Sequence, residues 1–253
     1  MAKALITGAS SGIGEAFARH LANMGYDLIV VARREERLQA LADKVTVDVE
    51  IVVADLTKRD DITRVESLIA SHDDIAYLVN NAGFSGVGLF ADQSIDFYDD
   101  MIQLHVMTST RLAHAVIPQM KANKNGAIIN VSSFGGFVPM PTSATYNATK
   151  AYLTSFSESL SMELAPHGIV VQALCPGFTY TEIWDTAGFE NTPDVPQIAW
   201  MSSDEVVIES LRAIPAKKYR VTPRLLYQIM WRLFQLAPLR YLLKRYMLQV
   251  NTP

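Results

Sequence analysis

The chain has 253 residues, of which 49% are hydrophobic and 19% charged, and this composition excludes an intrinsically disordered protein. The length fits one large α/β domain or two small ones, and the formal net charge of −4 does not indicate a nucleic-acid partner. The single cysteine, Cys175, excludes an intramolecular disulfide bond and favours a reducing, cytoplasmic location. No uncharged apolar run approaches the roughly 18 residues of a membrane-spanning helix. The chain enters a strand pattern almost at once, so we expect no signal peptide.

Short β-branched runs alternate with longer stretches of helical periodicity. The runs are continuously apolar, as expected of parallel strands that are buried on both faces. They lie at Ala4–Thr7, Leu28–Ala32, Glu50–Ala54, Tyr77–Asn80, Ala127–Ser132 and Ile169–Cys175. Helical patterns lie at Ile13–Met24, Glu35–Lys44, Asp61–Ser71, Phe97–Met120 and Tyr146–Ala165. This alternation predicts an α/β fold with a Rossmann-like, doubly wound parallel sheet and helices on both faces, formed by residues 1–210.

A glycine-rich turn follows the first strand and opens the first helix. Its glycines let the backbone approach a pyrophosphate closely, and the helix N-terminus supplies free N–H groups and a partial positive charge. The alternative is an ordinary βα turn, but its position between strand and helix favours nucleotide binding. The candidate cofactor-binding residues here are Gly8, Ser10, Ser11, Gly12, Ile13 and Gly14.

Two arginines stand where a site for NAD normally carries a carboxylate. The second strand ends at Ala32 and is followed by Arg33 and Arg34. A carboxylate would hold the ribose 2′-hydroxyl of NAD, whereas a guanidinium can bind the 2′-phosphate of NADP bidentately. The sequence therefore favours NADP(H), although a solvated charge pair at a helix start is the alternative. Further candidates are Asp55 and Leu56 after the third strand, for the adenine edge, and Asn81, Ala82 and Gly83 after the fourth, for the adenosine ribose side.

Tyr146 and Lys150 are four residues apart in a helical pattern and therefore share one face. Ser133 follows the fifth strand, so all three are expected at the mouth of the sheet. Reduction of a carbonyl produces an alkoxide that must be protonated, and a nearby ammonium group would tune a tyrosine for that transfer. Ser133 would donate a hydrogen bond to the substrate oxygen where charge develops. The Tyr-x-x-x-Lys spacing alone is weak evidence for a catalytic site. It becomes strong evidence in combination with Ser133 and the glycine-rich turn.

Taken together, these motifs resemble the short-chain dehydrogenase/reductase family in its short, single-domain branch. Thr7–Gly14 is similar to the family's TGxxxGxG turn, Asn80–Gly83 to its NNAG segment, and Ser133, Tyr146 and Lys150 to its catalytic serine, tyrosine and lysine. The segment that begins at Pro176 and Gly177 is similar to the family's PGxxxT motif. The resemblance covers about residues 2–210 and implies a seven-stranded sheet, a nicotinamide cofactor, and usually a homodimer or homotetramer. It also implies that Thr179 and Thr181 lie near the carboxamide and phosphates, and that Lys150 binds the nicotinamide ribose.

One position departs from the family pattern. His105 stands where the family commonly has an asparagine that orders a water between the lysine and solvent. An imidazole can donate and accept hydrogen bonds, so His105 could hold that water or relay protons itself. The alternative is a partly buried structural histidine, with the relay running from its backbone carbonyl.

The C-terminal part, residues 211–253, is predicted to be a basic, amphipathic helical extension that is either part of the same domain or a lid or interface element. From Ser210 onward the chain has nine basic and no acidic residues, whereas the rest has 13 basic and 26 acidic residues, a net charge of −13. Pro238 splits residues 221–253 into two expected short helices. They could cover the substrate pocket or a subunit interface, which is the interpretation that we favour. They could also contact an anionic membrane peripherally, or attract an acidic substrate such as an acyl thioester.

The sequence therefore predicts an NADP(H)-dependent oxidoreductase that transfers a hydride between nicotinamide and a carbonyl or alcohol group, with no metal ion. The expected substrate is an apolar ketone, aldehyde or 3-oxoacyl compound. The alternative is a catalytically silent NADP(H)-binding regulatory protein. An extended-branch epimerase or dehydratase is disfavoured, because the chain lacks an extra substrate domain. The expected pocket lining consists of Phe134, Phe137, Val138, Met140, Phe178, Tyr180 and parts of the irregular stretch Trp184–Trp200.

Overall fold

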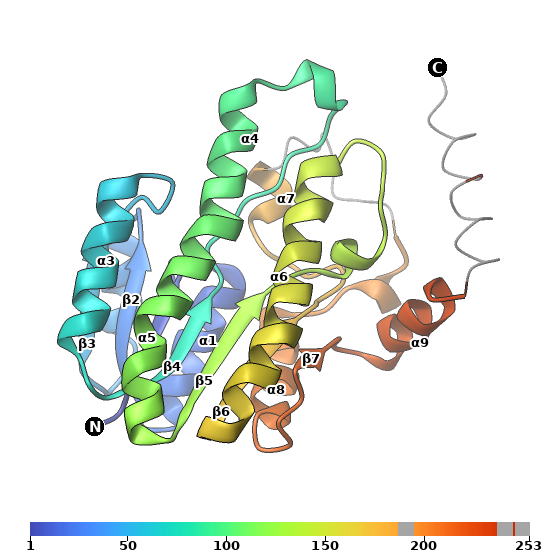
Figure 1. Cartoon of the computed structure of the whole chain (residues 1–253). Coiled ribbons are helices and arrows are strands. Elements are labelled where there is room, and N and C mark those ends of the chain that lie inside the picture. Colours follow the sequence, from blue (N-terminus) through green and yellow to red (C-terminus); the bar gives the residue numbers. More distant parts are fainter. Residues whose placement is uncertain (187–194, 237–244, 246–253) are drawn as a thin grey trace.

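In the computed structural model, which describes residues 1–186, 195–236 and 245, parallel strands form one twisted sheet between two layers of helices (Figure 1). The spatial order of the seven strands is β3-β2-β1-β4-β5-β6-β7. They are β1 (Lys3–Thr7), β2 (Asp27–Ala32), β3 (Val49–Val53), β4 (Ile75–Asn80), β5 (Gly126–Val131), β6 (Ile169–Leu174) and β7 (Arg220–Val221). All neighbouring pairs are parallel. The predicted Rossmann-like, doubly wound sheet is thus confirmed.

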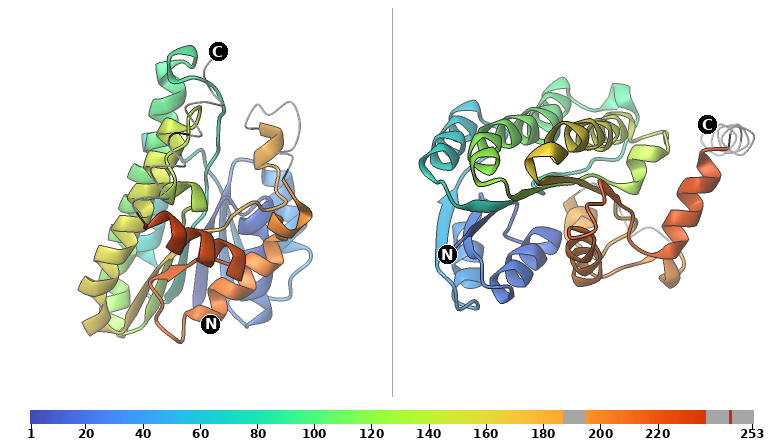
Figure 2. Two further views of the ribbon diagram at one scale, coloured as in Figure 1. Left: turned by 90° about the vertical axis from the view of Figure 1, so that its right-hand side faces the viewer. Right: turned by 60° about the horizontal axis from the view of Figure 1, so that its bottom comes forward.

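Helices cover both faces of the sheet (Figure 2). One apolar core lies beneath α1 (Gly12–Asn23), α2 (Glu35–Ala42) and α8 (Ser203–Ala213), and a second lies beneath α3 (Arg59–Ser71), α5 (Ser109–Asn123) and α6 (Ala144–Leu164). The central strands β1 and β2 are buried along nearly their whole length. Burial on both faces explains their continuous β-branched and leucine runs.

The predicted helix Phe97–Met120 consists of three consecutive helical segments. They are α4 (Ile95–Ile102), a π-helical stretch (Gln103–Thr108) and α5. The π-helical stretch contains His105, whose side chain is buried. Such widened turns are frequent at functional sites.

Two elements lie where the residue pattern predicted none. Helix α8 starts with a capping box, in which the Ser202 side chain accepts from the Glu205 backbone and Glu205 accepts from the Ser202 backbone. The short strand β7 extends the sheet next to β6. The stretch Trp184–Trp200, expected to be irregular, includes the end of the short helix α7 (Ile183–Thr186) and a 3₁₀ turn (Gln197–Ala199).

The first of the two expected C-terminal helices corresponds to α9 (Leu225–Phe234), and the second falls mostly outside the described residues. A 3₁₀ turn (Phe134–Phe137) contacts both α6 and α9. Among the helices of the described ranges, none combines the length and hydrophobicity needed to cross a membrane.

Candidate active site

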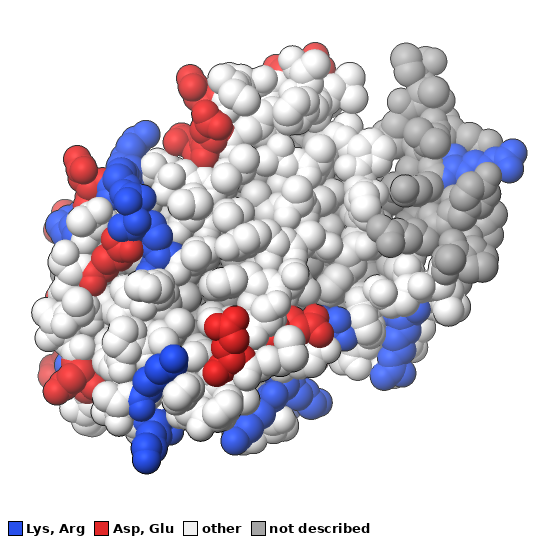
Figure 3. All heavy atoms as spheres, viewed as in Figure 1, with Lys and Arg blue, Asp and Glu red and all other residues white. Residues whose placement is uncertain are grey.

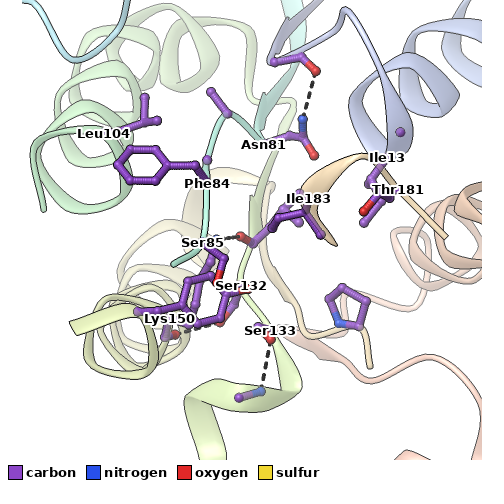
Figure 4. Close-up of a pocket in the computed structure, with 18 of the residues that line it drawn as sticks. Ile13, Asn81, Phe84, Ser85, Leu104, Ser132, Ser133, Lys150, Thr181 and Ile183 are labelled. Atoms are coloured by element: carbon purple, nitrogen blue, oxygen red, sulfur yellow. Dashed lines mark hydrogen bonds between the residues drawn. The ribbon is translucent and has the colours of Figure 1, made fainter. Parts of the chain in front are cut away.

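A cavity of about 1080 Å³ opens at the carboxyl ends of the strands and extends from the glycine-rich turn to α9. Its wall includes most of the residues that the sequence singled out, as Figure 4 shows for Ile13, Asn81, Ser133, Lys150 and Thr181. The predicted residues that line it are Gly8, Ser10, Ser11, Gly12, Ile13, Arg33, Arg34, Asp55, Leu56, Asn81, Ala82, Gly83, Ser133, Tyr146, Lys150, Pro176, Gly177, Thr179 and Thr181. Gly14 and His105 do not line this cavity.

The glycine-rich turn is shaped by close backbone packing. Gly8 has φ +67°, which disfavours residues with a side chain. A Cβ on Gly14 would lie 2.2 Å from the Gly8 oxygen and 2.5 Å from Asn81 Nδ2. That amide donates to the carbonyls of Thr7 and Gly8 over 2.9 and 3.2 Å, so it ties the end of β4 to the turn. The lack of a side chain at Gly14 therefore allows the turn and Asn81 to pack closely against the start of α1.

The start of α1 has the donor set that a phosphate group requires. Ser11, at the N-cap, makes no side-chain hydrogen bond to the first turn, so the helix N-terminus is not capped from within. Backbone N–H groups at such a terminus bind phosphate oxygens favourably. A dinucleotide pyrophosphate is thus compatible with this turn.

Arg33 and Arg34 both line the cavity, but they differ in their surroundings. Arg33 is exposed. Arg34 donates from Nη2 to the hydroxyls of Ser10 and Ser11, each over 3.0 Å, and from Nη1 to the Glu182 carboxylate over 2.9 Å. Arg34 is thus held directly against the glycine-rich turn. Asp55 accepts hydrogen bonds from the backbone and hydroxyl of Thr57, which fixes its carboxylate at the rim.

Ser133 and the 3₁₀ turn that follows it are packed tightly onto α6. The Ser133 hydroxyl accepts from Gly135 N over 3.0 Å. A Cβ on Gly136 would lie 2.8 Å from the carbonyl carbon of Lys150, so the absence of a side chain allows this approach. Residues with larger side chains here would push Ser133 away from the start of α6.

Tyr146 and Lys150 lie in the first two turns of α6 and face the end of β5. Lys150 Nζ donates to the Val131 carbonyl over 3.0 Å and lies 5.6 Å from the centre of the Tyr146 ring. Burial lowers the pKa of Lys150 to about 8. Burial also raises the pKa of Tyr146, and its hydrogen bond with Ser133 acts in the opposite direction. Burial therefore disfavours the charged form of both groups, the phenolate of Tyr146 and the ammonium of Lys150.

His105 is buried next to the site and links the segment after β4 to helix α6. Its Nε2 accepts from the backbone N–H of Phe84 over 3.2 Å, which leaves Nδ1 to donate to Thr149 Oγ1 over 2.9 Å. That hydroxyl in turn donates to the carbonyl of Tyr146. Burial, together with the charge of Lys150, lowers the pKa of His105 well below its usual 6.5, so the ring is neutral. Both ring nitrogens have protein partners, which favours the structural interpretation over the proton relay.

The far end of the cavity is apolar. Of the predicted lining residues, Phe134, Val138, Met140 and Phe178 are present. The prediction that Phe137 and Tyr180 line the cavity was wrong. Phe137 packs against Trp231, whereas Tyr180 stacks on Trp200 and is 57% exposed. Trp184, at the start of the predicted stretch Trp184–Trp200, lines the cavity as well. Lining residues that the sequence argument missed include Phe84, Leu104, Tyr227, Met230 and Phe234.

Tyr227 fastens α9 to this apolar wall. Its hydroxyl accepts from Phe178 N over 3.0 Å and donates to the Ala199 carbonyl over 2.6 Å. A Cβ on Gly177 would lie 1.9 Å from the Tyr227 ring, so this glycine makes room for the ring. The helical periodicity of residues 225–234 was visible in the sequence, but its contact with the segment after β6 was not.

Comparison with known proteins gives a consistent result. The model of the family described as short chain dehydrogenase matches residues 2–191. A short-chain dehydrogenase from Sphingobium yanoikuyae, solved in complex with NADPH, is 36% identical with a TM-score of 0.85, covering 100% of this chain and 97% of that one. A bulky-bulky ketone specific alcohol dehydrogenase from Comamonas testosteroni is 32% identical with a TM-score of 0.79, covering 100% and 95%. A very-long-chain 3-oxoacyl-CoA reductase from Pyrenophora tritici-repentis is 38% identical, over 68% of this chain and 53% of its own length.

Proposed function

This chain belongs to the short-chain dehydrogenase family, and from that premise we propose that it is an NADP(H)-dependent oxidoreductase acting on an apolar ketone, aldehyde or 3-oxoacyl compound, or on the corresponding alcohol. The observation that carries the proposal is one continuous cavity. It joins a phosphate-binding turn, with Arg34 beside it, to the Ser133, Tyr146 and Lys150 group and then to an apolar wall. The proposed assembly is a homodimer or homotetramer.

A bound nicotinamide supplies or accepts the hydride. Within the chain, Ser133 donates a hydrogen bond to the substrate oxygen, where negative charge develops during reduction. Tyr146 delivers its hydroxyl proton to that oxygen, and the reverse reaction returns it. Lys150, when protonated, stabilises the tyrosinate that forms and binds the nicotinamide ribose. The apolar wall from Phe134 to α9 holds the rest of the substrate and excludes water.

The NADP(H) preference rests on charge at the end of β2. The two residues that follow β2 are Arg33 and Arg34. The guanidinium of Arg34 donates hydrogen bonds to the hydroxyls of both serines of the glycine-rich turn. A 2′-phosphate on the adenosine ribose would pair with such a cation. The NADPH complex of the Sphingobium yanoikuyae protein supports this preference.

A substrate screen with a tyrosine variant tests the proposal. NADPH consumption would be followed with ketones, aldehydes and 3-oxoacyl thioesters, and NADH would serve as the cofactor control. Tyr146→Phe should bind NADPH as the native chain does but lose turnover by at least about 100-fold, the scale of a general acid–base contribution. Equal rates with NADH would overturn the cofactor assignment, and full activity of Tyr146→Phe would overturn the role of Tyr146.

A further inference from the structure

Helix α9 exposes an apolar stripe on the side opposite to the cavity. The stripe consists of Leu225, Ile229 and Leu233 on α9 and of Leu236 just beyond its end, and these side chains are 67%, 47%, 44% and 53% exposed. The first three are spaced by four residues, so they project from one side of the helix. The opposite side of α9 carries the cavity-lining Tyr227, Met230 and Phe234. This short helix is therefore apolar on two faces, and within the part of the chain that the structure describes only one of them is covered.

A stripe of this kind indicates an interaction surface, because contiguous exposed apolar residues are rare on monomeric soluble proteins. Figures 1 and 2 show α9 projecting from the body at the edge beyond β7. Among residues 1–186 and 195–236, neither the sheet nor its helical layers cover the stripe.

The charge of the C-terminal segment that contains α9 indicates the type of partner. From Ser210 to the end there are nine basic residues and no acidic one, whereas the rest of the chain has a net charge of −13. Arg212, Lys217, Lys218 and Arg232 are exposed. In Figure 3, the region that corresponds to α9 in Figure 1 shows white and blue atoms and no red ones outside the grey part. Because the rest of the chain is acidic overall, this basic end is the better match for an anionic surface.

We propose that the α9 stripe docks peripherally on an anionic lipid membrane. Leucine and isoleucine side chains on one face of a basic segment are the pattern by which amphipathic helices lie in the headgroup region. Lysine and arginine residues nearby add electrostatic attraction to anionic lipids. If the proposed function holds, the docked helix also places the apolar wall of the cavity next to the bilayer, from which an apolar substrate can enter.

The same charges argue against a dimer in which the α9 stripes of two copies face each other. A symmetric dimer through α9 would place the same patch of both copies face to face. Two segments with nine basic and no acidic residues would then repel each other. A membrane that contains phosphatidylserine or phosphatidylglycerol has the complementary charge.

Vesicle flotation of the full chain tests the proposal without requiring catalysis. The chain should float with vesicles of phosphatidylcholine and phosphatidylglycerol at low ionic strength, and much less with pure phosphatidylcholine or at high salt. Ile229→Glu should reduce the partition coefficient by about tenfold or more, since it places a charge where an apolar side chain would enter the headgroup region of the membrane. Met162→Glu is the matched control, because Met162 is 67% exposed on α6, and it should float as the native chain does.

Circular dichroism and the melting temperature establish that each variant is folded. Failure of the folded native chain to float with anionic vesicles at low salt would overturn the proposal, as would equal flotation of Ile229→Glu. A chain that does not float but changes from dimer to monomer with Ile229→Glu, seen by light scattering, would assign the stripe to a second copy instead. Flotation is measured without cofactor or substrate, so it remains informative if the proposed activity fails.

Discussion

The guanidinium of Arg34 and the carboxylate of Glu182 form an ion pair, 2.9 Å between Nη1 and Oε2, that connects the end of β2 to the segment after β6. Arg37 contacts the same carboxylate. Burial opposes ionisation of Glu182, but hydrogen bonds from Arg37 and Arg34 outweigh it and lower the pKa of this carboxyl. Glu182 is therefore ionised at neutral pH and pairs with the same cation that the proposed 2′-phosphate would use.

Glu182→Gln should tighten NADPH binding by up to about fivefold, because a half-exposed ion pair contributes about 0–1 kcal/mol and would no longer compete with the phosphate. NADH binding should change little, since NADH has no 2′-phosphate. Fluorescence titration gives both dissociation constants. Glu163→Gln, an exposed residue on α6, controls for the loss of one negative charge. Weaker NADPH binding by Glu182→Gln, or an equal effect on NADH, would contradict the competition.

Arg34→Ala should weaken NADPH binding by about tenfold or more, the scale of a hydrogen bond to a charged group. Arg33→Ala is the comparison, because Arg33 lines the same cavity and is exposed. Titration with NADPH and NADH separates loss of phosphate recognition from loss of general affinity. If Arg33→Ala alone impairs NADPH binding, the 2′-phosphate contact belongs to Arg33 and not to Arg34.

The βαβ framework was predictable because its signals are local. Each buried parallel strand is a continuous apolar run, and the glycine-rich turn contains its strand-to-helix geometry within eight residues. The short strand β7 has only two paired residues, so it leaves no periodic signal. Helix α8 was missed although Ser202 and Glu205 form a capping box, a signal that is visible in the sequence.

The parts of the site that were not predicted depend on contacts between distant segments. The Arg34–Glu182 pair joins residues 148 apart, and the Tyr227 hydroxyl bonds to Phe178, 49 residues away. Such pairs cannot be identified from one sequence without the fold. Phe137 and Tyr180 were expected in the pocket together with Phe134 and Phe178, yet residues close in sequence within a turn or loop face different sides.

Lys150→Met should stabilise the folded chain, and the effect should depend on pH. The pKa of Lys150 is lowered from 10.5 to about 8, so the folded state disfavours the charged form. Between these values the unfolded chain binds a proton that the folded chain releases, and native stability therefore rises with pH. The advantage of Lys150→Met should shrink by about 2–3 kcal/mol between pH 7 and pH 10. Urea unfolding at both pH values measures it, and a pH-independent difference would exclude this effect of burial.

His105→Asn should retain most of the activity, with a loss well below about 100-fold, because both ring nitrogens serve structural hydrogen bonds. The shorter side chain cannot span from Phe84 N to Thr149 as the ring does. We therefore expect a loss of about 1–3 kcal/mol in stability, the cost of leaving a buried polar group unpaired. Steady-state kinetics and urea unfolding separate the two effects. Because the family's usual residue here is an asparagine that serves the relay, a loss of activity beyond about 100-fold with unchanged stability would contradict the idea that His105 takes over that role.

Tyr227→Phe should loosen α9 from the cavity, because the hydroxyl joins Phe178 N and the Ala199 carbonyl. Unpaired, these two backbone groups should reduce the free energy of unfolding by about 1–3 kcal/mol. The KM for the carbonyl substrate should rise while NADPH affinity is unchanged, since the helix lines only the apolar end of the cavity. Tyr180→Phe, at an exposed tyrosine, is the matched control and should stay within about 0.5 kcal/mol of the native chain. Equal behaviour of the two variants would mean that the apolar packing of the ring against Phe134, rather than the hydroxyl, holds α9 in place.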